Sequence, residues 1–294
     1  MKGRREDHGV VLVTILAVMA LCVTVIVAMT NRSEEAVRST SRELDQQRVQ
    51  MLATSAEALV LAALQHDLET APQADGPPEP WAQIGQSDTL LALGPVQVRV
   101  WDESSRFNLN TVLDGSPTSR HYLKAIVAEA GLPPEVAVRI AAALRGGRPL
   151  LGTAELAARA GLSIAEVEAL APLVTSTPEA STTVNINSAS PLLLQGMLQN
   201  PDRAAHIVAR RATELITPKV LDSMGVILPA GLSLRSDVFG LEISAASGSA
   251  ILHTRALVQR WIGADGLAHA TVSARKWMSA RVAPDQADTP PSPG

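Results

Sequence analysis

The feature that most constrains this chain is an uninterrupted apolar run near its N-terminus. From Val10 to Met29 the sequence contains no charged residue, no proline and no glycine. As an α-helix this run is about 30 Å long, which is enough to cross the hydrocarbon core of a bilayer. Because lipid offers no partner for an unpaired backbone N–H or C=O, the run is predicted to be a transmembrane helix.

The length of this run and the place of its cleavage junction distinguish it from a secretory signal peptide, whose apolar core of about 7–15 residues is followed by a cleavage site. Here the best junction, Gly9–Val10, lies on the charged side instead. A charged leader, a glycine and an apolar helix in this order resemble a type IV prepilin signal. The resemblance implies that a prepilin peptidase cuts after Gly9 and that the new N-terminal Val10 is methylated. An ordinary single-pass anchor is the alternative for this stretch.

Composition excludes several classes of protein. The 294 residues are 46% hydrophobic, which is enough for a substantial core, and the net charge of −4 disfavours a phosphate-binding surface. The single cysteine, Cys22, lies in the apolar run, so an intramolecular disulfide and a Cys/His zinc site are both excluded. The six histidines form no H-E-x-x-H motif, and no nucleophile elbow, Walker loop or dinucleotide-binding motif is present. We therefore expect no enzyme and no cofactor.

The hydrophobic pattern predicts an α+β head on a long helix. Apolar residues at intervals of three, four and seven extend the first helix to Pro72, the first proline of the chain. Alternation predicts strands at 96–100, 232–243, 250–261 and 267–277, while residues 120–174 and 191–215 carry the pattern of short helices. Between them, Asp102, Asn108 and Asn110 are expected to hold a turn, with cation ligation as the alternative.

We divide the chain accordingly. The expected segments are a leader (1–9), a transmembrane helix (10–30), an amphipathic stem helix (31–71), the first part of the core (72–112), a helical insertion (113–231), the strands of the core (232–282) and a proline-rich disordered tail (283–294).

Six motifs that follow in order carry a second resemblance. They are Trp81, Asp102 with Arg106-Phe107-Asn108-Leu109-Asn110, Glu155-Leu156 with Gly161-Leu162, Leu173-Val174 before Pro178, Val184-Asn185-Ile186-Asn187-Ser188-Ala189, and Ser236-Asp237-Val238-Phe239. With the prepilin-like start, they resemble the minor pseudopilin K family of type II secretion systems (general secretion pathway protein K) over roughly residues 4–280.

This resemblance implies a pilin-like antiparallel sheet with a large inserted helical subdomain. It also implies a place at the tip of a periplasmic pseudopilus, where the protein helps to start assembly and supports the export of folded proteins. The expected partners are the minor pseudopilins of the I and J types, the major pseudopilin, the prepilin peptidase and the inner-membrane assembly platform. The expected location is the inner membrane of a Gram-negative bacterium, with the head in the periplasm.

Thr14 is the fifth residue from Val10, where most pilins carry a glutamate. A carboxylate in lipid is costly and is kept for a partner, in pilins the α-amino group of the neighbouring subunit. A subunit with nothing above it has no such amine to neutralise. Thr14 therefore suits a tip subunit, while a merely tolerated residue in the span is the alternative.

The resemblance has one gap, and a different class of protein competes with it. Where the family usually has an acidic segment, this chain has the basic, shortened Ala143–Pro149, so we do not carry over a calcium site.

The motif Asn185–Ser190 also resembles the start of a helix-hairpin-helix DNA-binding domain, as in membrane-anchored proteins of DNA uptake. The second glycine that such a hairpin needs near Gly196 is missing.

Overall fold

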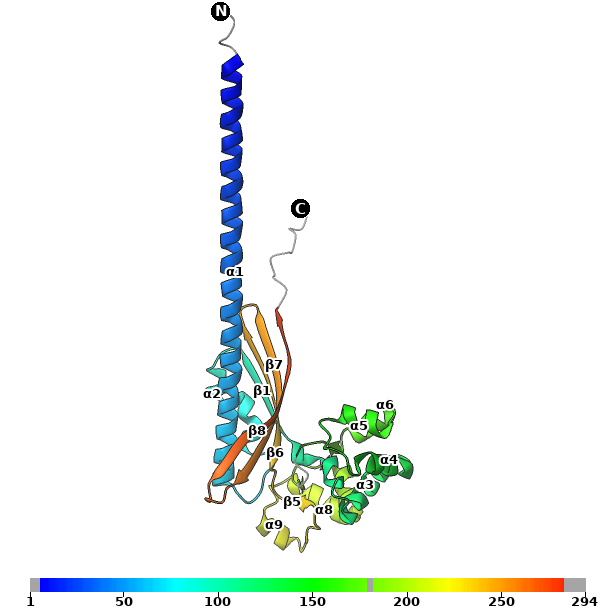
Figure 1. The fold of residues 1–294 in the computed structure, drawn as a ribbon. Helices are drawn as coiled ribbons and strands as arrows, with labels where there is room; N and C mark the ends of the chain where they lie inside the picture. The colour runs from blue at the N-terminus through cyan, green and yellow to red at the C-terminus, as the bar shows by residue number, and fades with distance from the viewer. Residues whose placement is uncertain (1–5, 179–181, 283–294) are drawn as a thin grey trace, which may run out of the picture.

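The computed structural model describes residues 6–178 and 182–282 (Figure 1). One helix, α1 (Glu6–Thr70), runs through 65 residues. Among the residues described, it is the one helix long and apolar enough to cross a membrane. The first five residues of the predicted leader and the predicted disordered tail, 283–294, lie outside the described residues.

The two halves of α1 have different surroundings. The apolar side chains from Leu12 to Met29 are all exposed. Farther along, Val49, Ala56 and Val60 are buried and belong to one hydrophobic core with the sheet. Their helical spacing places them on one side of α1, as expected for an amphipathic helix on a globular head. The first half of α1 is therefore bare, and only the second half packs on protein.

The main sheet has four antiparallel strands in the order β1-β6-β7-β8. The strands are β1 (Val96–Asp102), β6 (Val238–Ser247), β7 (Ala250–Ile262) and β8 (Ala268–Val282). Leu241, Ile243 and Val258 face α1 and are buried in the shared core. This sheet and the helices inserted between its first two strands confirm the predicted fold class.

Shorter elements fill the segments before and after β1. Between α1 and β1 lie η1 (Pro80–Gln86) and α2 (Asp88–Leu91). Between β1 and β6 lie η2 (Glu103–Ser105), β2 (Phe107–Asn108), η3 (Leu109–Val112), α3 (Pro117–Glu129), α4 (Pro134–Leu144), α5 (Thr153–Ala160), α6 (Ile164–Leu170), β3 (Val174–Thr175), β4 (Val184–Asn185), α7 (Pro191–Leu198), α8 (Pro201–Arg211), α9 (Pro218–Ser223) and β5 (Leu232–Ser233).

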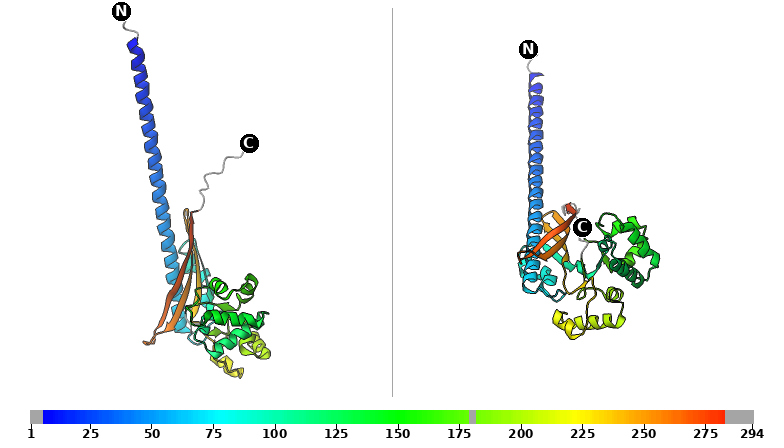
Figure 2. Two further views of the ribbon diagram at one scale, coloured as in Figure 1. Left: turned by 45° about the vertical axis from the view of Figure 1, so that its right-hand side comes forward. Right: turned by 60° about the horizontal axis from the view of Figure 1, so that its bottom comes forward.

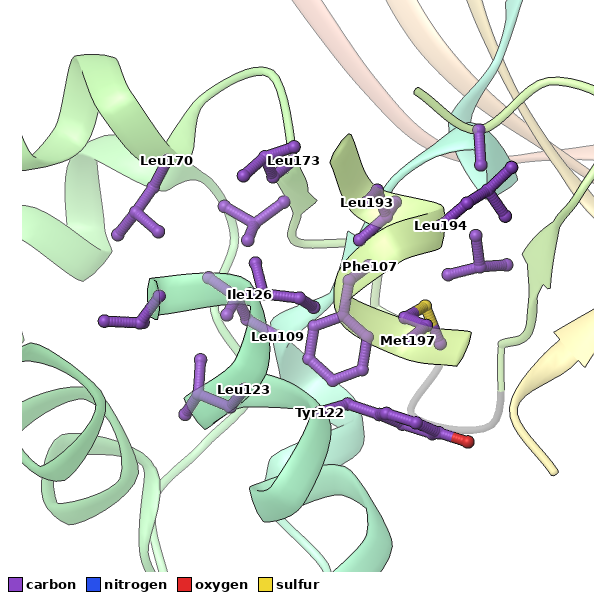
Figure 3. Close-up of a cluster of buried hydrophobic side chains, with 14 of the residues drawn as sticks. Phe107, Leu109, Tyr122, Leu123, Ile126, Leu170, Leu173, Leu193, Leu194 and Met197 are labelled. Atoms are coloured by element: carbon purple, nitrogen blue, oxygen red, sulfur yellow. The ribbon is translucent and has the colours of Figure 1, made fainter. Parts of the chain in front are cut away.

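These helices form a subdomain with a core of its own. Phe107, Leu109, Ile126 and Leu193 are buried in a cluster separate from the one under the sheet (Figure 3). The subdomain lies beside the sheet, near the end of α1 that is farthest from the N-terminus (Figures 1 and 2). The helices begin at local caps, such as the capping box of Ser163 and Glu166 predicted for α6.

The structure differs from the predicted pattern at two places. The alternation from Leu232 to Ile243 is not one strand, because β5 pairs in parallel with β4 and β6 begins only at Val238. Between the two strands the chain turns aside, and Ser236 is fully buried in polar contacts. Helix α9 was not predicted, although Thr217 before Pro218 is an ordinary start signal and caps it.

Candidate functional site

The motifs that carry the family resemblance meet in a buried polar joint between the sheet and the helical subdomain. Asp102 ends β1, Asn185 ends β4, and Ser236 precedes β6. The Ser236 hydroxyl donates to Asp102 Oδ2 at 2.6 Å, and Asn185 Nδ2 donates to Ser236 Oγ at 2.7 Å. Three motifs that are far apart in the sequence thus form one hydrogen-bonded group, which we call the polar joint.

Arg260 of β7 connects this joint to the stem helix. Its side chain is fully buried, and its guanidinium forms ion pairs with Asp67 of α1 (2.7 Å) and with Asp75 of the following loop. Its Nε donates to the Ser236 carbonyl at 3.1 Å. The guanidinium also lies 4.6 Å from the ring centroid of Phe239, within cation–π range. One side chain therefore contacts the helix end, the loop and the start of β6.

Asp75 and Glu79 hold the loop that follows α1. Asp75 accepts from the Ser236 backbone N–H at 2.7 Å, and its own N–H donates to the Leu234 carbonyl at 2.8 Å. Glu79 accepts from the Gly76 N–H at 2.7 Å and from Trp81 Nε1 at 3.0 Å. The Trp81 ring packs edge-on against Phe239 with centroids 4.9 Å apart. The motif residue Trp81 therefore lies beside the joint.

Burial controls the electrostatics of these carboxyl groups. It raises the pKa of Glu79 to about 7, against the hydrogen bonds from Trp81 and Gly76. It raises the pKa of Asp102 to about 6, against the hydrogen bonds from the Ser236 and Ser188 side chains. Burial also raises the pKa of Asp67, and Arg260 only partly offsets that effect. Burial by itself lowers the pKa of Arg260, but the carboxylates of Asp75 and Asp67 outweigh it and keep the guanidinium charged.

Three carboxyl groups next to the polar joint lie close enough to one another to suggest a metal site. Asp67, Asp75 and Glu79 each offer an oxygen atom within 4.8 Å of the others. Arg260 already pairs with both aspartates, and Glu79 already accepts two hydrogen bonds. Each of the three carboxyl groups therefore has polar partners within the protein, and the raised pKa values of Asp67 and Glu79 favour protonation where the single guanidinium does not balance the negative charge.

The two Asn-x-Asn motifs hold the helical subdomain in the same way. Asn108 and Asn185 each accept from the N–H two residues ahead, which closes a turn. Asn110 then binds both the N–H and the C=O of Leu150, while Asn187 binds both groups of Ile216. Each second asparagine thus fixes a distant loop through its backbone.

These contacts decide between the alternatives that the sequence left open. The turn predicted for Asp102, Asn108 and Asn110 is confirmed, because their side chains bond local and distant backbone groups. Asn185 and Asn187 are buried. Gly196 packs against α3, where an added Cβ would lie 3.2 Å from Glu129 Cγ. Gly196, the glycine that such a hairpin would bring close to phosphate, is therefore buried inside the subdomain.

The loop where the family usually carries acidic residues is held by a cation. Arg159 donates to the carbonyl of Ala143 at 2.8 Å and to that of Arg148 at 2.8 Å. Arg148 in turn pairs with Glu155 at 2.8 Å. A guanidinium that bonds the carbonyl oxygens of a basic loop leaves no set of oxygen ligands for calcium, so these residues do not fit that ion.

The site residues predicted from the N-terminal pattern lie far from the joint. Gly9, Val10 and Thr14 are all in the first turns of α1, and Thr14 is exposed. Arg260, which connects the polar joint to the stem helix, was not predicted to be a functional residue. Its signal was present, since Ala256, Val258 and Arg260 alternate on the buried face of β7. A charged side chain at a buried position of a strand requires a charged partner.

The ion network makes a prediction about stability. Replacing Arg260 with methionine leaves the buried carboxylates of Asp67 and Asp75 unpaired, so we expect a loss of about 3–5 kcal/mol in the free energy of unfolding. Urea unfolding of the full chain in detergent measures it. The matched control is Arg275→Met, which removes a more exposed ion pair between β8 of the same sheet and Glu57 of α1 and should cost less than about 1 kcal/mol. Equal losses in the two variants would contradict the role given to Arg260.

The raised pKa of Asp102 makes a prediction about pH. Because its pKa of about 6 in the folded chain exceeds the ordinary 3.8, folding favours the protonated carboxyl group. The ionised Asp102 carboxylate destabilises the folded chain. This destabilisation is absent below pH 3.8, grows as the pH rises toward 6 and is complete above it, where it amounts to about 2–3 kcal/mol. Asp102→Asn removes this effect, so the variant should gain stability relative to the parent chain between about pH 4.5 and pH 7.5. Urea unfolding at both pH values tests it, with the exposed-face Glu242→Gln as control. A pH-independent difference would refute it.

Comparison with known proteins identifies the relatives of this chain. No protein-family model matches it. Type II secretion system protein K of Klebsiella pneumoniae is 26% identical over 245 residues, which cover 71% of this chain and 72% of that protein. The protein of the same name from Pseudomonas aeruginosa is 27% identical over 248 residues, which cover 72% and 74% of the two chains.

A solved structure has the same fold. A chain in the crystal structure of the GspK-GspI-GspJ complex from the enterotoxigenic Escherichia coli type 2 secretion system matches with a TM-score of 0.59 and 19% identity. The match covers 82% of this chain and 99% of that chain. The resemblance drawn from the six motifs is confirmed: this chain is a relative of type II secretion system protein K.

Proposed function

We propose that this chain is a minor pseudopilin at the tip of the type II secretion pseudopilus, where it helps to start assembly and supports the export of folded proteins across the outer membrane. The observation that carries the proposal is the division of α1 into a bare apolar half and a half packed on an antiparallel sheet. Such a helix anchors the chain in the inner membrane and offers a stem to neighbouring subunits, with the head in the periplasm.

Two features favour a terminal place in the fibre. Thr14 supplies no carboxylate for the amine of a subunit above, whereas the α-amino group of Val10 becomes available for a subunit below once the leader is removed. The helical subdomain projects to the side of the sheet near the far end of α1 (Figure 2), which makes the head bulky for a closely stacked array. Both features suit a subunit that caps and nucleates the fibre.

The proposed partners follow from this place. The solved relative was crystallised in a complex named GspK-GspI-GspJ, which supports minor pseudopilins of the I and J types as neighbours. The major pseudopilin, the prepilin peptidase and the inner-membrane assembly platform complete the set. The proposed role is structural, because the carboxyl groups of Asp67, Asp75, Glu79 and Asp102 are engaged in ion pairs and hydrogen bonds within the protein.

Processing provides the first test. Gly9→Leu should block removal of the leader, because a prepilin peptidase cuts after this glycine. Mass spectrometry of the N-terminal peptide measures it, and the parent chain should begin at Val10. The control is Gly3→Leu, which changes another glycine of the leader and should leave cleavage intact. A mature N-terminus beyond Met29, or an intact leader in a strain with active peptidase, would contradict the proposal.

The position in the fibre provides the second test. Thr118 is exposed on α3 and serves as a labelling position after Thr118→Cys, because Cys22 lies in the apolar half of α1. Gold-maleimide on purified pseudopili should appear at one end only. The parent chain is the control for labelling at Cys22. Signal distributed along the shaft would rule out the tip assignment.

A further inference from the structure

In the part of the chain that the structure describes, the outer edge of β8 has no strand beside it. Among the described residues, β8 pairs only with β7. Residues 268–282 make no other backbone–backbone hydrogen bond with any described residue. The opposite edge of the sheet is protected, because η1 packs on β1 so closely that a Cβ on Gly85 would lie 2.1 Å from the Val98 carbonyl oxygen. An open edge presents unpaired N–H and C=O groups that an extended peptide can pair with.

A row of charges crosses the sheet and ends at this edge. Arg99, Glu242, Arg255 and Lys276 lie directly opposite one another on successive strands. Arg99 and Glu242 form an ion pair at 2.7 Å. Arg255 and Lys276 are exposed, and neither has an acidic partner within 4.0 Å in the part of the chain that the structure describes. Like charges directly opposite each other destabilise a sheet.

Trp101 holds Arg255 in this arrangement. Its indole lies over Gly240, where an added Cβ would be 2.0 Å from the ring. The guanidinium groups of Arg99 and Arg255 lie 5.3 Å and 4.8 Å from the ring centroid. Trp101 Nε1 is in turn fixed by Glu103 at 2.7 Å. The cation of Arg255 is therefore stacked on an aromatic face.

The stem helix does not take part in this row. Arg275, the neighbour of Lys276, pairs with Glu57 of α1. Because successive side chains of a strand point to opposite faces, Lys276 lies on the face away from α1. β8 is thus tied to the stem on one face, while its edge and its other face are open.

We propose that the β8 edge binds an extended, acidic segment of a protein partner as a fifth strand. The partner's backbone would pair with the open edge, and one of its carboxylates would lie opposite Lys276. The row of charges would then end in a carboxylate beside Lys276, next to the two adjacent cations of Arg255 and Lys276. The proposal concerns the β8 edge alone and does not depend on the position of the subunit in the fibre.

Crosslinking in cells tests the site. Thr271 is exposed on β8, opposite Gln259, and p-benzoylphenylalanine at this position in the full chain should crosslink to a segment with an aspartate or glutamate. Lys276→Glu should reduce the crosslink by more than about tenfold, because it places a like charge against the partner's carboxylate. Changing that carboxylate to lysine should restore the crosslink in the Lys276→Glu chain. The matched position is Gln97, exposed on the protected edge strand β1, which should not reach the same segment.

Two controls exclude trivial explanations. Lys276→Glu should raise the Tm of the full chain in detergent, since it relieves the repulsion with Arg255, so that weaker crosslinking would not reflect unfolding. Lys276→Arg keeps the charge and should keep the crosslink. A crosslink that is insensitive to the charge at position 276, that reaches a lipid or a segment without a carboxylate, or that joins β8 to residues 283–294 of the same chain would overturn the proposal. So would the absence of any protein crosslink from Thr271.

Discussion

The structure depends on one buried cation. Arg260 lies where the stem helix ends, where the next loop begins and where the chain enters β6, and it bonds to all three. Buried ion pairs add little net stability over apolar residues of similar volume, but removing one partner is costly. The guanidinium has a fixed fork of donors, so it specifies the positions of Asp67 and Asp75 as well as attracting their negative charge. This geometry ties β7 to the end of the stem helix, beside the apolar core that α1 shares with the sheet.

The helical subdomain is attached to that centre by two similar devices. In each, a two-residue strand pairs in parallel with a strand that follows later in the subdomain, β2 with β3 and β4 with β5. In each, an Asn-x-Asn motif closes a turn and then clamps a distant loop. Asn185 belongs to the second device and also to the polar joint, where it bonds Ser236. The subdomain is therefore connected to the sheet through hydrogen bonds as well as through its chain connections.

This construction suits a protein whose head must keep a defined position on its anchor. The bare half of α1 and the packed half belong to one unbroken helix, so the joint at its end fixes the head relative to the apolar half. The β8 edge and the row of charges that ends there (Arg99, Glu242, Arg255 and Lys276) take no part in the joint and lie at the surface of the head. Polar groups are buried at the joint with their partners, while Arg255 and Lys276, which have no acidic partner among the described residues, are exposed to water.

The sequence by itself determined the long helix, the antiparallel strands, the inserted helices and the family resemblance. These follow from local periods and caps, such as the alternation at Val96–Val100 and the capping box of Ser163 and Glu166, because such patterns act between near neighbours in the chain. Only the tertiary structure decided that Ser236 interrupts the strand pattern, that Arg260 pairs with Asp67 and Asp75, and that the asparagines clamp Leu150 and Ile216. Those contacts join residues between about 30 and 190 positions apart, and their favourable energy exists only after the burial that the whole fold creates.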